Sequence, residues 1–317
     1  SAQSKAVLHT EGPLLILAGA GAGKTKVITH RILHLIKQGV PGNAILAITF
    51  TNKAAKEMRE RMEKLLNVDR NINLPTHFTE RPFLSTFHSL GVHILKENSK
   101  FLDLPRHFAI FDRSDSMSAV RSATKESGLD SKEFEPGRML SIISKEKGRG
   151  VTLSMYQERM RDAMEERLAE VWERYEKTLK HEGALDFDDL LLRTSILLAQ
   201  NQEIRKKYQE TWTHLHIDEY QDTNAVQYEI ARLLTGEKKN ICVVGDIDQS
   251  IYSWRGADFK NIMRFEKDYP NTTVILLEQN YRSTKNILKA ANTVIAKNVF
   301  RVEKNLYTEN PMGEKLY

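Results

Sequence analysis

Several short apolar runs, each followed by a helical pattern, constrain the fold of this chain more than any other feature. They cover residues 13–18, 44–49, 83–87, 214–218, 240–246 and 273–278. A continuous apolar run of this length is typical of a strand buried on both faces, as in a parallel sheet. Alternation of such strands with helices predicts a doubly wound α/β domain, in which ligands bind at the carboxyl ends of the strands.

The pattern changes to helices only between residues 89 and 185, which predicts an all-helical subdomain inserted into the α/β domain. The spacing predicts one long helix over residues 154–181. Its apolar stripe consists of Met164, Leu168, Val171, Trp172, Tyr175 and Leu179. Core packing is the better interpretation of this aromatic stripe, since glutamates and arginines occupy the other faces.

Composition narrows the class of protein without identifying a function. The chain has 317 residues, with 47 basic and 42 acidic side chains and a net charge of +5, which permits a polyanionic partner but does not require one. No apolar run reaches the ~18 residues that a membrane span needs. The single cysteine, Cys242, lies in an apolar run, which excludes a disulfide framework and predicts a cytoplasmic location.

A glycine-rich loop, AGAGAGKT, lies between the first apolar run and the helical pattern after it. Glycines let the backbone curl so that successive N–H groups point at phosphate oxygens, and the start of the helix adds its positive dipole end. Lys24 is expected to reach the β- and γ-phosphates of a nucleotide, and the Thr25 hydroxyl to bind Mg²⁺. The residues predicted to surround the phosphates are Ala18, Gly19, Ala20, Gly21, Ala22, Gly23, Lys24 and Thr25.

Two adjacent carboxylates, Asp218 and Glu219, follow another apolar run. In a chain with a phosphate loop, this pair predicts a division of roles. We expect Asp218 to hold Mg²⁺, directly or through water, and Glu219 to orient and deprotonate the attacking water. The alternative is a solvated or helix-capping acid pair.

The stretch LDFDDLLLR, residues 185–193, contains three carboxylates and leaves two interpretations open. Asp186 or Asp188 can cap the helix that follows, or the carboxylates can form a second metal site. We favour capping because no histidine or further ligand stands at metal-binding spacing nearby.

Ordered blocks along nearly the whole chain resemble the UvrD/PcrA/Rep group of superfamily 1 DNA helicases, and within it the PcrA-type enzymes most. The matching blocks are Gln3, AGAGAGKT, AITFTNKAAKEMRERM, STFHS, LDFDDL, IDEYQDTN, VGDIDQSIYSWRGAD and LEQNYRST. The resemblance implies a RecA-like P-loop domain that uses ATP and Mg²⁺.

The resemblance also implies roles around the nucleotide. Gln3 would read the adenine edge and Tyr281 would stack on the adenine ring. Gln249 would sense the γ-phosphate, and Arg282 would reach it as an arginine finger that spreads transition-state charge. The residues with an implied catalytic role are Lys24, Glu219, Gln249 and Arg282.

A third set of residues is implied to contact single-stranded DNA. Tyr252 and Trp254 would stack on unpaired bases, with Arg255 nearby, and Phe50 would offer a second stacking surface. From the residues alone, Trp254 reads as a core or interface residue. The implied DNA contacts are Phe50, Asn52, Thr86, His88, Phe187, Tyr252, Trp254 and Arg255.

The leading hypothesis is the ATP-binding half of a 3′→5′ helicase acting on single-stranded DNA and duplex junctions, with repair or replication proteins as possible partners. We expect residues 1–88 and 186–282 to form the motor domain, 89–185 the insertion, and 283–317 the start of a truncated second motor domain. On this hypothesis the fragment alone is nearly inactive and does not unwind DNA. The alternatives are a subunit of a recombination helicase–nuclease and a non-motor module that binds nucleotide or DNA. RNA as the track is excluded only by the resemblance.

Overall fold

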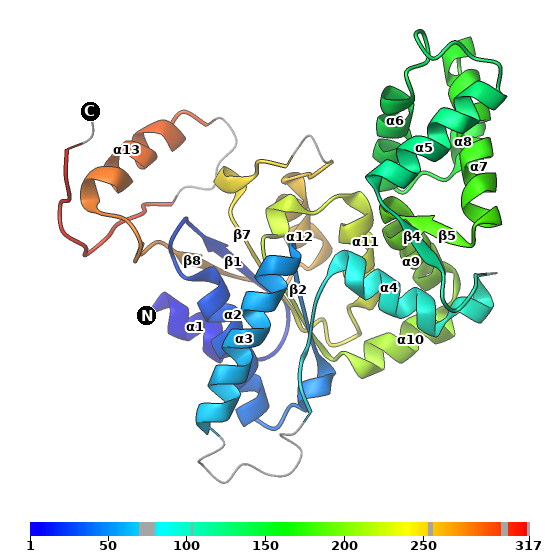
Figure 1. The fold of residues 1–317 in the computed structure, drawn as a ribbon. Helices are drawn as coiled ribbons and strands as arrows, with labels where there is room; N and C mark the ends of the chain where they lie inside the picture. The colour runs from blue at the N-terminus through cyan, green and yellow to red at the C-terminus, as the bar shows by residue number, and fades with distance from the viewer. Residues whose placement is uncertain (70–79, 103, 253–255, 299–303, 316–317) are drawn as a thin grey trace. The chain divides into compact units, whose positions relative to one another are not determined.

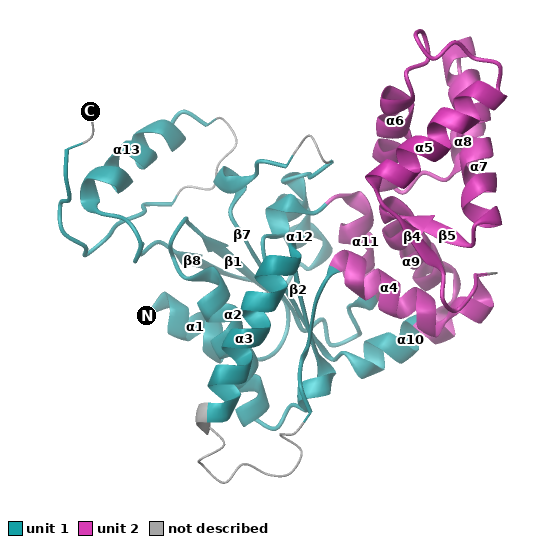
Figure 2. Cartoon of the chain, in the orientation of Figure 1, with its two compact units in different colours: residues 1–86, 205–223, 234–317 teal, residues 87–204, 224–233 magenta. Residues whose placement is uncertain are grey.

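The chain folds into two compact units in the computed structural model (Figures 1 and 2). The structure describes residues 1–69, 80–102, 104–252, 256–298 and 304–315. The first unit comprises Ser1–Thr86, Arg205–Thr223 and Leu234–Tyr317, and the second comprises Phe87–Ile204 and Asn224–Leu233. The helical unit thus extends beyond residues 89–185 at both ends and includes a separate later segment.

The first unit contains a six-stranded parallel sheet with the order β3-β2-β6-β7-β1-β8. The strands are β1 (Leu14–Ala18), β2 (Ile45–Thr49), β3 (Phe83–Thr86), β6 (His214–Ile217), β7 (Ile241–Gly245) and β8 (Thr273–Leu277). Each strand lies inside one of the predicted apolar runs. The predicted α/β fold with a parallel sheet is therefore confirmed.

Helices cover this sheet because alternate strand residues point to opposite faces. The helices whose residues lie wholly in the first unit are α1 (Ala2–Leu8), α2 (Lys24–Lys37), α3 (Asn52–Asp69), α12 (Lys260–Asp268) and α13 (Lys285–Ile295). On one face, Leu14 and Ile16 pack in a core with Ile28 of α2 and Met58 of α3. Cys242 of β7 belongs to the same core, as expected for a structural cysteine.

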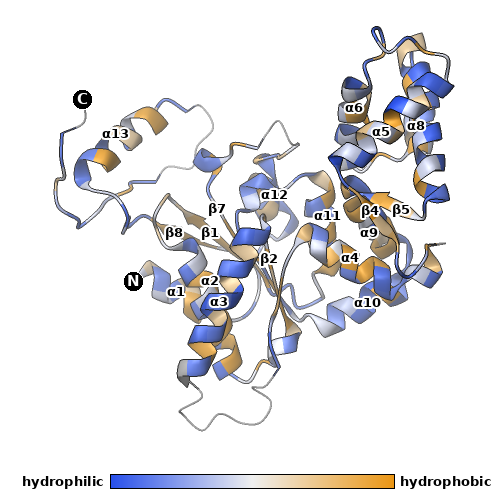
Figure 3. Ribbon diagram, in the orientation of Figure 1, coloured by the Kyte–Doolittle hydropathy of each residue, from blue (hydrophilic) through white to orange (hydrophobic). Residues whose placement is uncertain are grey.

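Helix α3 illustrates how the pattern of its sequence determines its packing. Met58, Met62 and Leu66 recur every four residues and are buried against the sheet. The remaining positions are mostly charged and exposed, so that α3 is largely hydrophilic in Figure 3, whereas the strands are hydrophobic. The charged stretch of α3 is thus mainly a solvated helix face.

The second unit is mostly helical. Its helices are α4 (Phe87–Glu97), α5 (Arg113–Glu126), α6 (Pro136–Gly148), α7 (Leu153–Gln157), α8 (Ala163–His181) and α9 (Phe187–Gln200). Most of α11 (Ala225–Leu234) also belongs to this unit, whereas α10 (Gln202–Thr211) crosses the boundary between the two units in the sequence. A two-stranded parallel sheet of β4 (Ala109–Phe111) and β5 (Ala184–Asp186), which the sequence did not predict, adds to these helices. Trp172 and Tyr175 are fully buried in its core, which confirms the core-packing interpretation of the aromatic stripe.

The helix predicted over residues 154–181 is wrong as one element. It is two helices, α7 and α8, because Asp162 caps α8 by accepting a hydrogen bond from the Glu165 N–H. Met164, placed in the apolar stripe, stands in the first turn of α8 and is 45% exposed. The helical spacing of apolar residues continues past Asp162, so the spacing alone did not reveal the break between α7 and α8.

The parallel order gathers the ends of the strands along one edge of the sheet. The glycine loop follows β1, the carboxylate pair follows β6, and residues 246–252 follow β7. No helix in the described parts of the chain is long and apolar enough to cross a bilayer.

Candidate nucleotide site and nucleic-acid interface

Residues 19–23 form the turn between β1 and α2. Gly21 and Gly23 have φ angles of 69° and 84°, a left-handed conformation that favours glycine. A Cβ atom at Gly21 would also lie 2.7 Å from the Nδ2 atom of Asn280, so that a larger residue does not fit. Helix α2 begins directly after this turn, at Lys24. The result is a curled backbone at a helix N-terminus, the geometry that binds phosphate.

Three successive carbonyl groups of this loop accept hydrogen bonds from donors outside it. Asn280 Nδ2 donates to Ala20 at 2.7 Å, the Tyr281 N–H donates to Gly21 at 3.0 Å, and Gln3 Nε2 donates to Ala22 at 2.9 Å. The loop is therefore held in shape by the chain itself, which lowers the cost of ordering it around a ligand.

Lys24 lies between the two groups that were predicted to act on the γ-phosphate. Its Nζ atom is 2.9 Å from Glu219 Oε2 and 3.4 Å from Gln249 Oε1. Glu219 has φ of 52°, one of two left-handed non-glycine residues in the described chain. Such strained residues cluster at functional sites, where the surroundings hold them in place.

Thr25 and Asp218 form the candidate magnesium site. Thr25 Oγ1 donates to Asp218 Oδ2 at 3.2 Å, although 193 positions separate the two residues. Two oxygens that share the inner sphere of an octahedral Mg²⁺ lie about 3 Å apart, so this pair fits the ion. Burial, together with the negative charge of Glu219, raises the pKa of Asp218 to about 6.

The described residues contain no group of three or more histidine, cysteine, aspartate or glutamate side chains that could hold a metal. Mg²⁺ does not require such a group, because it is usually held by one or two protein oxygens together with water and substrate phosphates. At residues 185–193 the carboxylates serve other purposes: Asp186 caps α9 in a capping box with Asp189, and both bind Lys147. The capping interpretation of this stretch is confirmed.

The predicted adenine and γ-phosphate contacts lie beside the phosphate loop. Tyr281 is 51% exposed, and its hydroxyl donates to Gln279 Oε1. Arg282 is exposed, and its backbone N–H donates to Asn280 Oδ1 at 2.9 Å. Gln249 is fixed from the other side, since its Nε2 atom donates to Asp246 Oδ2 at 2.6 Å.

The DNA-contact candidates of the first unit are found in different environments. Phe50 and Tyr252 stack on each other, with ring centroids 5.1 Å apart and planes inclined by 28°. Asn52 is exposed at the start of α3, whereas Thr86 is buried. Trp254 and Arg255 lie outside the described residues.

Two further candidates belong to the second unit and contact each other. The rings of His88 and Phe187 meet edge to face, with centroids 5.6 Å apart. Phe187 is 51% exposed, at the first position of α9. Burial lowers the pKa of His88 to about 4, so this side chain is neutral at physiological pH.

Comparison with known proteins identifies the family of the chain. The family model of the UvrD/REP helicase N-terminal domain matches residues 1–270, and that of the UvrD-like helicase C-terminal domain matches residues 275–317. The chain belongs to the UvrD/REP helicase family. The ATP-dependent DNA helicases PcrA of Staphylococcus aureus and of Leuconostoc citreum are each 46% identical over 99% of this chain. The chain spans 42% and 41% of those relatives.

Two residues of the candidate site were missed by the sequence analysis, although both lie in blocks that it quoted. Asn280 is 2% exposed and joins the phosphate loop to the Arg282 turn. Gln221 is 1% exposed and donates to Glu219. A buried amide side chain beside predicted catalytic residues is the signal that would have found them.

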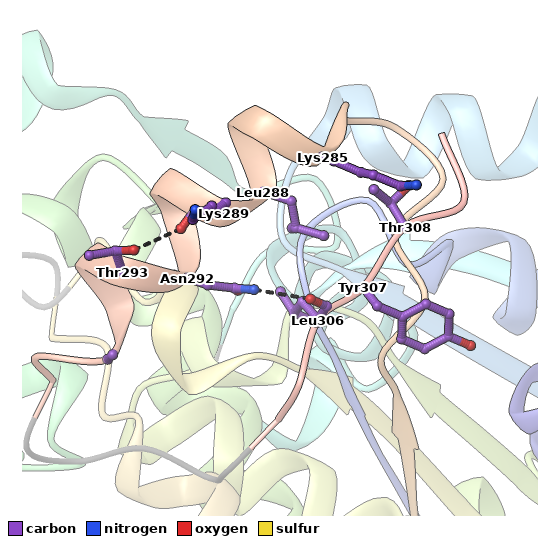
Figure 4. A pocket seen from close by; sticks show the side chains of 9 residues that line it. Lys285, Leu288, Lys289, Asn292, Thr293, Leu306, Tyr307 and Thr308 are labelled. Carbon is purple, nitrogen blue, oxygen red and sulfur yellow. Dashed lines mark hydrogen bonds between the residues drawn. The ribbon is translucent and has the colours of Figure 1, made fainter. Parts of the chain in front are cut away.

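The C-terminal segment of this UvrD/REP chain contains a pocket of about 630 Å³. Leu288 and Asn292 of α13 line it together with Leu306, and Asn292 Nδ2 donates to the Leu306 carbonyl group (Figure 4). Among the described residues, none of those predicted to contact nucleotide or DNA lines it. The pocket nevertheless adjoins the phosphate loop, because the Leu306 side chain occupies the space that a Cβ atom at Gly19 would need.

Proposed function

We propose that this chain is the ATP-binding and ATP-hydrolysing part of a DNA helicase that moves 3′→5′ along single-stranded DNA in the cytoplasm. Its relatives are named as ATP-dependent DNA helicases, and it spans about two fifths of their length. Residues 283–317 would lead into a second motor domain that completes the nucleotide site. Repair and replication are the processes that this activity serves.

One observation carries the proposal: Lys24 contacts both Glu219 and Gln249, next to the Thr25–Asp218 pair. A module that only bound nucleotide would have no use for a carboxylate poised beside the phosphate lysine. This set unites a phosphate-binding ammonium group, a base, a γ-phosphate sensor and a magnesium site within one cluster.

The contacts of Lys24 also indicate how binding prepares the site. Phosphate oxygens compete with Glu219 and Gln249 for the same ammonium group, so nucleotide binding would transfer Lys24 to the β- and γ-phosphates. Glu219 would then accept a proton from the attacking water, and Arg282 would stabilise charge on the γ-phosphate. Asp218 and Thr25 would hold Mg²⁺, which shields the phosphate charge when it is bound.

The DNA track would pass the aromatic residues that follow β2 and β7. Tyr252 comes three positions after Gln249, so one short segment joins the γ-phosphate sensor to a candidate stacking ring. Phe50 already stacks on Tyr252, and an unpaired base would add to this pair or replace one of its members. Trp254 and Arg255 are proposed as further DNA contacts, as are Asn52, Thr86, His88 and Phe187.

The test is Glu219→Gln in the full-length protein. We expect ATP binding to persist and DNA-stimulated ATP hydrolysis to fall by about 10³-fold or more, because the base is lost while the phosphate contacts remain. Unchanged hydrolysis would overturn the proposal and favour a non-motor binding module.

The 317-residue chain alone provides a second test. We expect weak ATP binding, very slow hydrolysis and no unwinding, since half of the nucleotide site would be missing. Robust DNA-stimulated hydrolysis by this chain, abolished by Glu219→Gln, would contradict that expectation. A nuclease activity in the full-length protein would favour a recombination helicase–nuclease.

A further inference from the structure

Polar groups that follow β1, β6 and β7 form a closed ring of contacts. Glu219 contacts Lys24, Lys24 contacts Gln249, and Gln249 contacts Asp246. Gln221 closes the ring, because it contacts both Asp246 and Glu219. Lys24, Glu219 and Gln249 belong to the candidate nucleotide site, and Asp246 contacts Gln249. Gln221 has had no role assigned so far.

Gln221 uses both ends of its amide group. Its Nε2 atom donates to Glu219 Oε2 at 2.8 Å, and its Oε1 atom accepts from the Asp246 N–H at 2.9 Å. The side chain is 1% exposed. A Cβ atom at Gly245 would lie 2.7 Å from its Oε1 atom, so the glycine leaves the space in which this amide sits.

The partner of Gln221 needs to be held in position. Glu219 has a left-handed backbone, with φ of 52° and ψ of 44°, which is strained for a residue with a side chain. Its carboxylate is shared between Gln221 and Lys24, through the same Oε2 atom. When Lys24 moves to phosphate, Gln221 becomes the side chain that still holds Glu219 in its catalytic orientation.

We infer that Gln221 is a positioning residue for catalysis: its amide orients the Glu219 carboxylate and ties it to the backbone of the loop that carries Gln249. This rests on the proposed function. The base and the γ-phosphate sensor are thereby held at a fixed separation, so that a shift of the loop after β7 also shifts the base. Gln221 acts through Glu219 and does not itself touch the reacting atoms.

The test compares two variants in the full-length protein. Gln221→Glu keeps the acceptor for the Asp246 N–H but cannot donate to Glu219, and Gln221→Met removes both hydrogen bonds at similar length. We expect both to lower kcat for DNA-stimulated ATP hydrolysis by about 10–100-fold, the size of effect that a misplaced catalytic group produces. The KM for ATP should change by less than about 3-fold, because the phosphate contacts remain.

A matched control is Gln227→Glu. Gln227 is also buried, and its Oε1 atom accepts from the Asn224 N–H at 3.0 Å, a bond that glutamate retains. We expect kcat within about 2-fold of the wild-type value for this variant. An equal loss in the control would mean that any buried substitution slows the enzyme, and would overturn the assignment.

Double variants separate positioning from general damage to the fold. In a Glu219→Gln background, Gln221→Met should change the residual hydrolysis by less than about 3-fold, because residues that act as a unit are not additive. A full additional loss, unchanged kcat in both single variants, or unfolding of both would each overturn the inference. If Glu219→Gln itself left hydrolysis intact, the proposed function would fail first, which distinguishes the two failures.

Discussion

Two lysines in this molecule bind carboxylates at nearly the same distance in very different surroundings. Lys24 of the phosphate loop is 2.9 Å from Glu219. Lys147 of the helical unit is 2.8–2.9 Å from Glu176, Asp186 and Asp189. The distances are alike, so the difference between the two sites lies in the number of partners and in access to water.

Lys147 is buried, and its carboxylate partners also form other hydrogen bonds. Its side chain is 1% exposed, and Asp186 also accepts from Tyr175 while capping α9. Burial alone would lower the pKa of Lys147, but Asp189, Asp186 and Glu176 raise it well above its ordinary value, so the charge persists. Such a cluster can stabilise one packing of its helices but has no free position for a ligand.

Lys24 has fewer partners, and its main partner is open to solvent. The Glu219 side chain is 35% exposed, and its backbone is left-handed. At the phosphate loop the backbone is strained, and Lys24 and Glu219 remain accessible to a ligand. At Lys147 all the charged groups are already paired with one another. This comparison teaches that a buried ion cluster points to stability, whereas a strained, partly exposed one points to ligand exchange.

The largest effect should come from breaking the sealed cluster. Lys147→Met removes the buried cation that three carboxylates share and leaves only Arg193, beside Glu176 and Asp189, which should lower the free energy of unfolding by about 3–5 kcal/mol. Urea denaturation followed by circular dichroism measures the change. ATP affinity of the folded variant should be unchanged.

The control for this substitution is Lys177→Met, which breaks the exposed ion pair with Glu173. An exposed pair of this kind is screened by water and contributes little, so little change in stability is expected. A similar loss in both variants would show that burial does not distinguish these lysines, and the comparison would break.

The next largest effect should come from Lys24, where substitution should lower activity and leave stability nearly unchanged. Lys24→Met should reduce ATP hydrolysis by about 10²–10³-fold, because a preorganised charge on the transferred phosphate is lost. Stability should change by less than about 1 kcal/mol, since the ion pair is only partly buried. Steady-state hydrolysis and urea denaturation of the same preparation test both halves. A large loss of stability with full activity would contradict the assignment of Lys24.

Asn280 sharpens the comparison, because it is a buried, hydrogen-bonded side chain that lies beside the phosphate loop. Asn280→Asp keeps the acceptor for the N–H groups of Arg282 and Ser283 but sets a carboxylate against the Ala20 carbonyl group. We expect ATP affinity to fall by about 10-fold, the scale of one hydrogen bond left unmade. Titration with a fluorescent ATP analogue measures it. The control is Asn286→Asp, at a half-buried asparagine whose amide donates to the Gly313 and Glu314 carbonyl groups. Equal affinities would show that the loop holds its shape without this contact.

The sequence predicted the sheet well because its strands are buried and read as continuous apolar runs. It placed Lys24, Thr25, Asp218 and Glu219 at strand ends, and the parallel order brings them together. The break before α8 was missed, because the capping role of Asp162 depends on a local hydrogen bond within an uninterrupted helical period. β4 and β5 were missed because three-residue strands are too short to show a period.

The roles of the buried amides could not be read from periodicity. Gln221 meets Asp246 across 25 positions, and Asn280 meets Ala20 across 260. Contacts over such separations depend on how the strands are ordered in the sheet, and neither amide lies in a repeating pattern. The pairing of Phe50 with Tyr252 is hidden for the same reason, since each follows a different strand.

The smallest effect concerns His88, a half-buried ionisable group in the helical unit that responds to desolvation by staying neutral. Its pKa is lowered to about 4, from 6.5. As the pH falls from 6.5 towards 4, the unfolded chain takes up a proton that folded His88 refuses, so acid favours unfolding. His88→Gln cannot titrate, and the loss of stability between pH 7 and pH 4.5 should shrink by about 1–2 kcal/mol.

Urea denaturation at several pH values provides the measurement and its own control. The lost contact with Phe187 shifts stability equally at every pH, whereas the titration effect appears only below pH 6.5. Parallel pH profiles for wild type and variant would mean that His88 becomes charged in the folded chain. It would then be a cation available to DNA phosphate, as Lys24 would be to the phosphates of a nucleotide. A flatter profile for the variant would show that His88 stays neutral in the folded chain. Any contact that it makes with DNA would then be that of a neutral ring.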